Sequence, residues 1–196
     1  MKAIFAVLSY LLGAVPTGYL VFKLSERKDI RKFGSRNTGA TNVMRLKGWK
    51  LAVPVVLADV LKGFLPAFLA VRLFGDLRLA LIASFLAVVG HCFPVYIRFH
   101  GGKGVATTVG AAAGLAFVPL LVSMTVFLVV VGLTRYVSLG SILAVVFFPV
   151  FVHVFGGAVE TVAWGAAIAV LVVLKHRGNI GRLLAGRERK LGEKAS

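Results

Sequence analysis

A glycine-rich basic segment separates two apolar runs of this sequence and contains the residue types that bind phosphate. Three glycines, Gly101, Gly102 and Gly104, surround Lys103. Glycine N–H groups can close around an anion, and lysine adds a positive charge. We expect residues 105–116 to form a helix, whose N-terminus also attracts anions. The segment predicts a phosphate site, and the alternative is a flexible basic loop on the membrane face.

A second polar segment, residues 34–45, is dense in hydrogen-bond donors. Ser35, Asn37 and Thr41 supply hydroxyl and amide groups. Arg45 could bind a phosphate through two parallel N–H bonds. This segment could therefore hold a second anionic group, or it could serve only to cap a helix and bind lipid headgroups.

Three further candidates lie near the ends of apolar runs. Ser141 stands where we expect a helix to begin, so its hydroxyl could cap that helix or bind a phosphate there. His176 could be a general base, and Asn179 could orient a hydroxyl or carbonyl group. The alternative, favoured by position alone, is a basic end of a membrane span with a solvated histidine.

Asp59 and Lys62 lie inside an apolar run and, three residues apart, share a helix face. Ionisable groups are costly in a membrane and usually face a polar interior. A structural ion pair is at least as good an interpretation as a substrate-binding role.

The composition indicates an integral membrane protein with a single domain, residues 1–196. Of the 196 residues 59% are hydrophobic and 15% are charged, against about 45–50% and about 25% in soluble domains. The formal charge of +16 lies next to apolar spans, which favours anionic lipids and substrates over nucleic acid. Cys92 is the single cysteine and the four histidines are dispersed, so no metal site or cofactor is expected.

The apolar runs predict an all-α bundle of about seven transmembrane helices. Several are near 15 residues, below the usual ~20, and Pro119 could instead kink one long helix. The predicted spans are residues 3–22, 51–74, 77–97, 105–118, 119–133, 141–155 and 158–174.

The distribution of basic residues predicts the orientation of the chain. The segments on one side, 23–50, 98–103, 135 and 175–196, hold 19 of the 23 lysines and arginines. Because cytoplasmic loops are enriched in these residues, we expect the N-terminus outside and the C-terminus in the cytoplasm.

Five blocks along the chain resemble bacterial membrane glycerol-3-phosphate acyltransferases that use acyl phosphate as the donor. The resemblance covers essentially the whole chain, although Arg36 and Gly178 stand where most members have Gly and Glu. The blocks are 34–45 (GSRNTGATNVMR), 59–63 (DVLKG), 90–107 (GHCFPVYIRFHGGKGVAT), 135–141 (RYVSLGS) and 176–183 (HRGNIGRL), with Gly186 and Glu188.

The resemblance implies acyl transfer from acyl phosphate to the 1-hydroxyl of sn-glycerol 3-phosphate, the first acylation of phospholipid synthesis. The products would be lysophosphatidic acid and inorganic phosphate. We expect a monomer in the bacterial inner membrane, with its active site on the cytoplasmic side. A transporter for an organic phosphate is the rival hypothesis.

The resemblance also suggests roles for the candidates. We expect Lys103, Ser141, His176 and Asn179 to bind mainly glycerol phosphate. The acyl phosphate or a shared polar pocket would involve Ser35, Asn37, Thr41, Arg45 and the backbone of Gly101–Gly104. No histidine is followed five residues later by aspartate, so we expect direct attack by the hydroxyl, with the donor's phosphate accepting the proton or, alternatively, His176 acting as the base.

Overall fold

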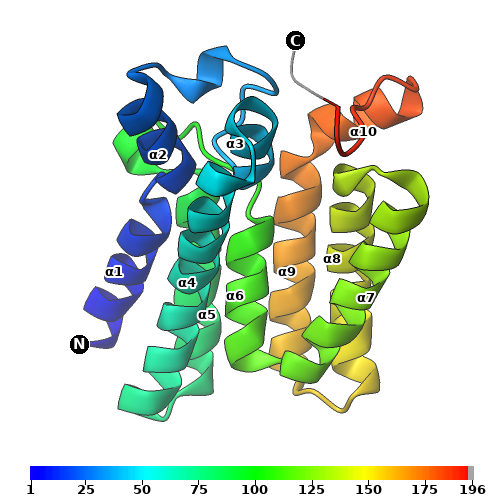
Figure 1. Cartoon of the computed structure of the whole chain (residues 1–196). Helices are drawn as coiled ribbons and strands as arrows, with labels where there is room; N and C mark the ends of the chain where they lie inside the picture. Colours follow the sequence, from blue (N-terminus) through cyan, green and yellow to red (C-terminus); the bar gives the residue numbers. More distant parts are fainter. Residues whose placement is uncertain (194–196) are drawn as a thin grey trace. The chain divides into compact units, whose positions relative to one another are not determined.

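The computed structural model describes residues 1–193, and the regular structure of that part is entirely helical (Figure 1). The chain divides into two compact units, residues 1–111 and 112–191, and one helix, α6, crosses the boundary.

The first unit contains membrane helices and a polar region. The predicted span 3–22 is two helices, separated by Val15 and Pro16, since proline lacks the N–H that a continuing helix needs. Its elements are α1 (Lys2–Ala14), α2 (Thr17–Glu26), the 3₁₀ helix η1 (Ile30–Lys32), α3 (Ala40–Lys47), α4 (Trp49–Phe74), α5 (Leu77–Cys92), the 3₁₀ helix η2 (Val95–Ile97) and the start of α6 (Val105–Leu115).

Glycines allow helix backbones of this unit to touch. A Cβ atom on Gly13 of α1 would lie 2.1 Å from the carbonyl oxygen of Ala87 in α5, and one on Gly63 of α4 would lie 1.9 Å from that of Thr107 in α6. Small residues at such crossings permit close packing without a hydrophobic driving force, as is typical inside membranes. The contact at Gly63 brings the first turn of α6 directly against α4.

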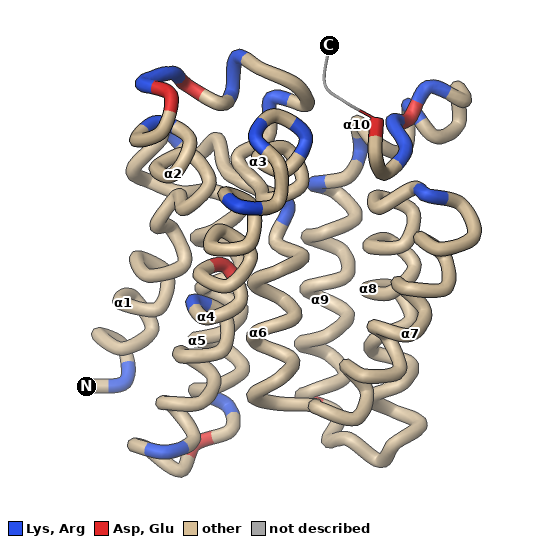
Figure 2. Tube along the Cα trace, viewed as in Figure 1, with Lys and Arg blue, Asp and Glu red and all other residues tan. Residues whose placement is uncertain are grey.

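A small apolar cluster holds the polar region to the helices. Ile30 and Val43 are fully buried and pack with Phe22, Ala52 and Val55. The cluster joins α2, η1, α3 and the first turns of α4. The basic connection between α2 and α4 is therefore a folded layer at one end of this unit, as Figure 2 shows by the charges gathered there.

The second unit contains α7 (Phe117–Thr134), α8 (Val137–Val154), α9 (Val159–Lys175) and α10 (Arg177–Leu184). Phe148 of α8 packs edge-on against Trp164 of α9, with ring centroids 5.9 Å apart. Pro119 lies in the first turn of α7, where its missing N–H costs nothing. The prediction of two helices rather than one kinked at Pro119 is confirmed, but the break lies at Ala116, because α6 ends at Leu115 and α7 begins at Phe117.

The described residues confirm an all-helical multi-pass protein, but only in part the expected seven spans. Five segments have the length and composition of a span: Lys2–Glu26, Trp49–Phe74, Leu77–Ile97, Phe117–Thr134 and Val137–Val154. The bent pair α9 and α10 would make a sixth. The remaining predicted span, 105–118, is the 11-residue helix α6, whose length of about 16 Å is well below the ~30 Å of a bilayer core.

Candidate functional site

The glycine-rich loop packs against His91 at the end of α5. The amide of Gly102 donates a 3.0 Å hydrogen bond to the carbonyl oxygen of His91. Gly104 has a positive φ of 87°, which suits glycine, and its carbonyl accepts from the amide of Thr108 at 2.8 Å in the first turn of α6. The loop therefore delivers Lys103 directly to a helix N-terminus, where N–H groups lack helical partners.

Asn42 shapes the other polar segment, residues 34–45. It is 1% exposed, and its amide nitrogen donates to the carbonyls of Phe33 and Asn37 at 3.2 and 2.9 Å. Its amide oxygen accepts from the amide of Ser35 at 2.9 Å. Sequence reasoning did not single out Asn42, since an asparagine in a polar loop gives no sign of being buried.

The candidates of this segment occupy a folded turn and the helix α3. The side-chain oxygen of Asn37 accepts from the amide of Gly39 at 2.8 Å, a local turn contact. Thr41 and Arg45 are both half-buried and lie one turn apart on α3, so they share a face. Ser35 is exposed. All four candidates lie in the first unit, as does the glycine-rich loop.

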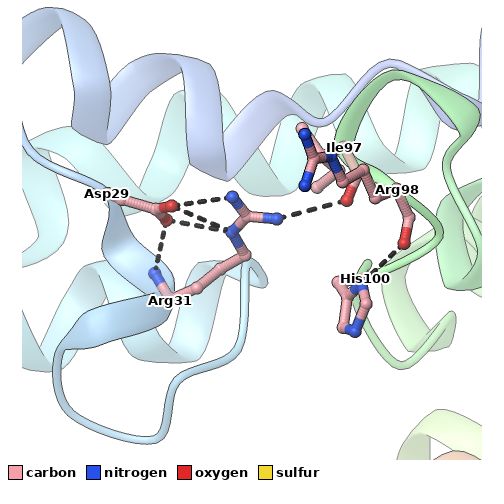
Figure 3. A network of polar contacts seen from close by, with 5 residues as sticks. All are labelled: Asp29, Arg31, Ile97, Arg98 and His100. Atoms are coloured by element: carbon pink, nitrogen blue, oxygen red, sulfur yellow. Dashed lines mark hydrogen bonds and ion pairs between the residues drawn. The ribbon is translucent and has the colours of Figure 1, made fainter.

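A contact through Arg31 joins the chain before each of these segments (Figure 3). Arg31 donates to Asp29 through Nε and Nη2, and its Nη1 donates to the carbonyl of Ile97 at 3.2 Å. His100 Nδ1 donates to the carbonyl of Arg98 at 2.5 Å. The hydrogen bonds from Arg31 hold the pKa of Asp29 below its usual value despite partial burial. This ion pair therefore stays charged at neutral pH, and Arg31 links residues 29–31 to Ile97, four residues before the glycine-rich loop.

Asp59 and Lys62 form a buried ion pair. Lys62 Nζ lies 2.7 Å from Asp59 Oδ1, with both side chains at most 4% exposed. Lys62 also donates to the carbonyl of Val15 at 3.0 Å, and Thr17 donates to the Asp59 carboxylate. The pair thus satisfies polar groups at the break between α1 and α2, as a carbonyl inside a membrane protein requires.

In the second unit Glu188 gathers three side chains. Its Oε1 accepts from Ser138 Oγ at 2.8 Å and from Asn179 Nδ2 at 2.5 Å, and its Oε2 accepts from Arg182 Nε at 2.7 Å. Burial raises the pKa of Glu188, but the bonds from Asn179, Ser138 and Arg182 outweigh it and lower that pKa below its usual value. In the sequence, Glu188 is one of two acidic residues of the basic tail and accompanies the block 176–183 in the family resemblance, but nothing there indicates its three partners.

His176 is not the solvated histidine at a span end that its position alone favoured. His176 is 2% exposed, so the alternative of a solvated histidine is wrong, because the bend between α9 and α10 turns it inward. Its Nδ1 lies 2.8 Å from the carbonyl of Val172. A carbonyl only accepts, so Nδ1 carries the proton and Nε2 the lone pair in the neutral ring.

Ser141 is not a capping residue, since α8 already begins at Val137. The span predicted to begin at Ser141 thus starts one turn earlier, within the polar residues that follow Arg135. The hydroxyl of Ser141 is buried and donates to the carbonyl of Val137 at 2.8 Å. Ser138, a partner of Glu188, lies about one turn before it.

The described residues contain no group of three or more His, Cys, Asp or Glu placed to hold a metal ion.

Comparison with known proteins supports the family suggested by the five sequence blocks. The family model described as glycerol-3-phosphate acyltransferase matches residues 3–186. The chain belongs to this family. The family resemblance expected from the five blocks is thereby confirmed, and the transporter hypothesis is not supported.

Relatives in the glycerol-3-phosphate acyltransferase family match over nearly their full length. The protein of Thermoanaerobacter pseudethanolicus is 41% identical over 189 residues, which is 96% of this chain and 95% of the relative. That of Syntrophotalea carbinolica is 43% identical over 184 residues, which is 93% of each chain.

Two crystal structures of PlsY (YgiH), an integral membrane glycerol 3-phosphate acyltransferase, share the fold. Its glycerol 3-phosphate form has a TM-score of 0.93 and 40% identity, covering 97% of this chain and 96% of that one. Its lysophosphatidic acid form has a TM-score of 0.90 and 38% identity, covering 97% and 95%. The likeness places this chain among integral membrane enzymes.

Proposed function

We propose that this protein transfers an acyl group from acyl phosphate to the 1-hydroxyl of sn-glycerol 3-phosphate. The products are lysophosphatidic acid and inorganic phosphate. The observation that carries the proposal is the glycine-rich loop, which packs on His91 and presents Lys103 at the N-terminus of α6. Backbone N–H groups, a lysine and a helix N-terminus together favour a phosphate group.

The candidate residues divide between the two substrates. Lys103, Ser141, His176 and Asn179 bind glycerol 3-phosphate. Because the Ser141 hydroxyl already donates its proton to the carbonyl of Val137, its oxygen remains free to accept a hydrogen bond from a hydroxyl group of the substrate. The acyl phosphate, or a polar pocket that both substrates share, uses Ser35, Asn37, Thr41, Arg45 and the backbone of Gly101–Gly104.

The chemical step needs little help from a base. The hydroxyl oxygen of glycerol 3-phosphate attacks the carbonyl carbon of the acyl phosphate, and the bond from that carbon to the phosphate oxygen breaks. The leaving phosphate takes the proton of the hydroxyl. In a competing version His176 takes this proton on Nε2, the nitrogen left with a lone pair by the contact of Nδ1 with Val172.

The proposed membrane arrangement has a single functional domain and seven crossings, one of which is the short helix α6. The N-terminus lies outside and the C-terminus in the cytoplasm of a bacterial inner membrane, with the active site on the cytoplasmic side and the monomer as the working form. The asymmetry of basic residues supports this orientation. Reporter fusions at Arg135 and after Glu193 should both give cytoplasmic signals, and a periplasmic signal at either position would contradict it.

The activity is tested on purified protein in detergent. We expect acyl phosphate and glycerol 3-phosphate to yield lysophosphatidic acid and inorganic phosphate in equal amounts. Glycerol without phosphate should be a poor acceptor, because the charged contacts of Lys103 would be lost. A protein that used only an acyl thioester as the donor, and never acyl phosphate, would refute the proposed donor.

A further inference from the structure

His91 packs against the backbone of the glycine-rich loop, and the proposed reaction assigns it no role. It is 8% exposed and belongs to the last turn of α5. A Cβ atom on Gly102 would lie 2.0 Å from Nε2 of His91, and its next nearest atoms, at 2.7 and 2.9 Å, belong to the same ring. The imidazole therefore touches the backbone of the loop one residue before Lys103, where a larger residue than glycine does not fit.

Asp59 stands on the opposite edge of the His91 ring. Its Oδ1 lies 3.6 Å from Nδ1 of His91, longer than a hydrogen bond but close enough for the carboxylate to attract a proton on Nδ1. Lys62 holds this carboxylate at 2.7 Å, and Thr17 donates to it. A carboxylate anchored in this way favours one orientation of the ring.

We propose that His91, backed by Asp59, is a positioning residue that sets the backbone of the Gly101–Gly104 loop for phosphate binding. This inference rests on the proposed function, in which the loop binds a phosphate group. A loop with three glycines has many accessible backbone conformations. Contact with the ring and carbonyl of His91 selects one of them before the substrate arrives, which lowers the ordering cost of binding.

A size exchange between His91 and Gly102 tests the proposal. The variants are His91→Ala, Gly102→Ala and the two combined, and the measurement is calorimetric binding of glycerol 3-phosphate without any donor, alongside KM and kcat. Each single variant should weaken binding roughly ten- to hundredfold. His91→Ala removes the ring that supports the loop, and Gly102→Ala adds a methyl group that pushes the loop away from that ring. In the double variant the new methyl group takes the space of the lost ring, so it should bind about tenfold more tightly than Gly102→Ala alone.

Gly101 provides the matched control. A Cβ atom on Gly101 would lie 2.2 Å from the carbonyl oxygen of His91 and 2.3 Å from Cδ of Pro94. His91→Ala removes neither atom, so it should not rescue Gly101→Ala. His153→Ala, at an exposed histidine of α8, should bind like the wild-type protein.

The outcomes separate the proposal from a purely structural role. Binding losses that simply multiply in the double variant would overturn it, as would a His91→Ala protein with lower thermal stability and unchanged binding. If His91→Ala does not fold, His91→Gln, whose amide can reach the place of Nε2, allows the same comparison. A wild-type protein that binds no glycerol 3-phosphate would instead refute the proposed function itself.

Discussion

The side-chain amide of Asn179 donates a 2.5 Å hydrogen bond to Oε1 of Glu188, and the hydroxyl of Ser138 donates to the same oxygen. A single carboxylate thus holds a substrate-binding candidate of α10 against the first turn of α8. In the proposed function Asn179 binds glycerol 3-phosphate, and it can do so in one geometry only while its amide is held. We therefore expect Glu188 to affect both stability and activity.

Glu188→Gln should lower the free energy of unfolding by about 1.5–3 kcal/mol, since hydrogen bonds to a charged group are lost and the new amide faces the Arg182 donor. The pKa of Glu188 is lowered by folding, so its charge stabilises the fold above the ordinary value of 4.5 and this gain disappears as pH falls through the lower, folded value. Thermal unfolding in detergent should therefore show a difference in melting temperature between variant and wild type. This difference should narrow as the pH falls through the folded-state pKa of Glu188. Glu193→Gln, at an exposed glutamate, should change little, and a gap that stayed constant would contradict the role of the charge.

Lys103→Ala should raise the KM for glycerol 3-phosphate. Loss of one charge-assisted contact typically costs about 1.5–3 kcal/mol, or roughly ten- to 150-fold in affinity. Steady-state kinetics with varied glycerol 3-phosphate measure the effect. Lys50→Ala, at an exposed lysine in the first turn of α4, controls for the loss of one positive charge. An unchanged KM in Lys103→Ala would remove Lys103 from the site.

His176→Asn distinguishes the two proton acceptors. The asparagine amide can still donate to the carbonyl of Val172, while Nε2 is removed. If the donor's phosphate accepts the proton, the variant should retain reduced activity at saturating glycerol 3-phosphate. Its rate should still fall in acid, because a phosphate monoester has its second ionisation near ~6. Complete inactivity with substrate binding intact would make His176 the base, and His153→Asn serves as the control.

Removing one member of the Asp59–Lys62 ion pair should destabilise the fold more than replacing both charged side chains. Asp59→Asn leaves the buried Lys62 ammonium without a compensating charge, which should destabilise the fold by about 3–5 kcal/mol. Adding Lys62→Met removes that charge and should recover part of the loss. Chemical denaturation in detergent measures both variants. Asp76→Asn, which breaks the exposed pair with Lys2 and keeps a side chain able to cap α5, should have little effect. A double variant less stable than Asp59→Asn would show that Lys62 stabilises through Val15 instead.

The sequence alone determined the class of the protein, most of its helices and its family. Apolar runs of span length report membrane insertion directly, because each residue contributes its own transfer free energy. The start of α6 after Gly104 also follows from local backbone preferences, and Pro119 indicated a helix boundary within three residues of the actual break at Ala116. The motifs at residues 34–45 and 101–104 predicted donor-rich segments, since both the residue types and their spacing lie within one short stretch of chain.

Tertiary structure alone decided which partner each polar residue has. Glu188 bonds to Ser138, 50 residues away, and the ring of His91 lies between Asp59 and Gly102. Nothing local in the chain marks such pairs, because they depend on how closely helices approach, as at Gly63 against Thr107. The same holds for His176, whose type indicated chemistry but whose burial follows from the bend between α9 and α10. A side chain's chemistry is local, whereas its partner and its access to water are set by packing between distant segments.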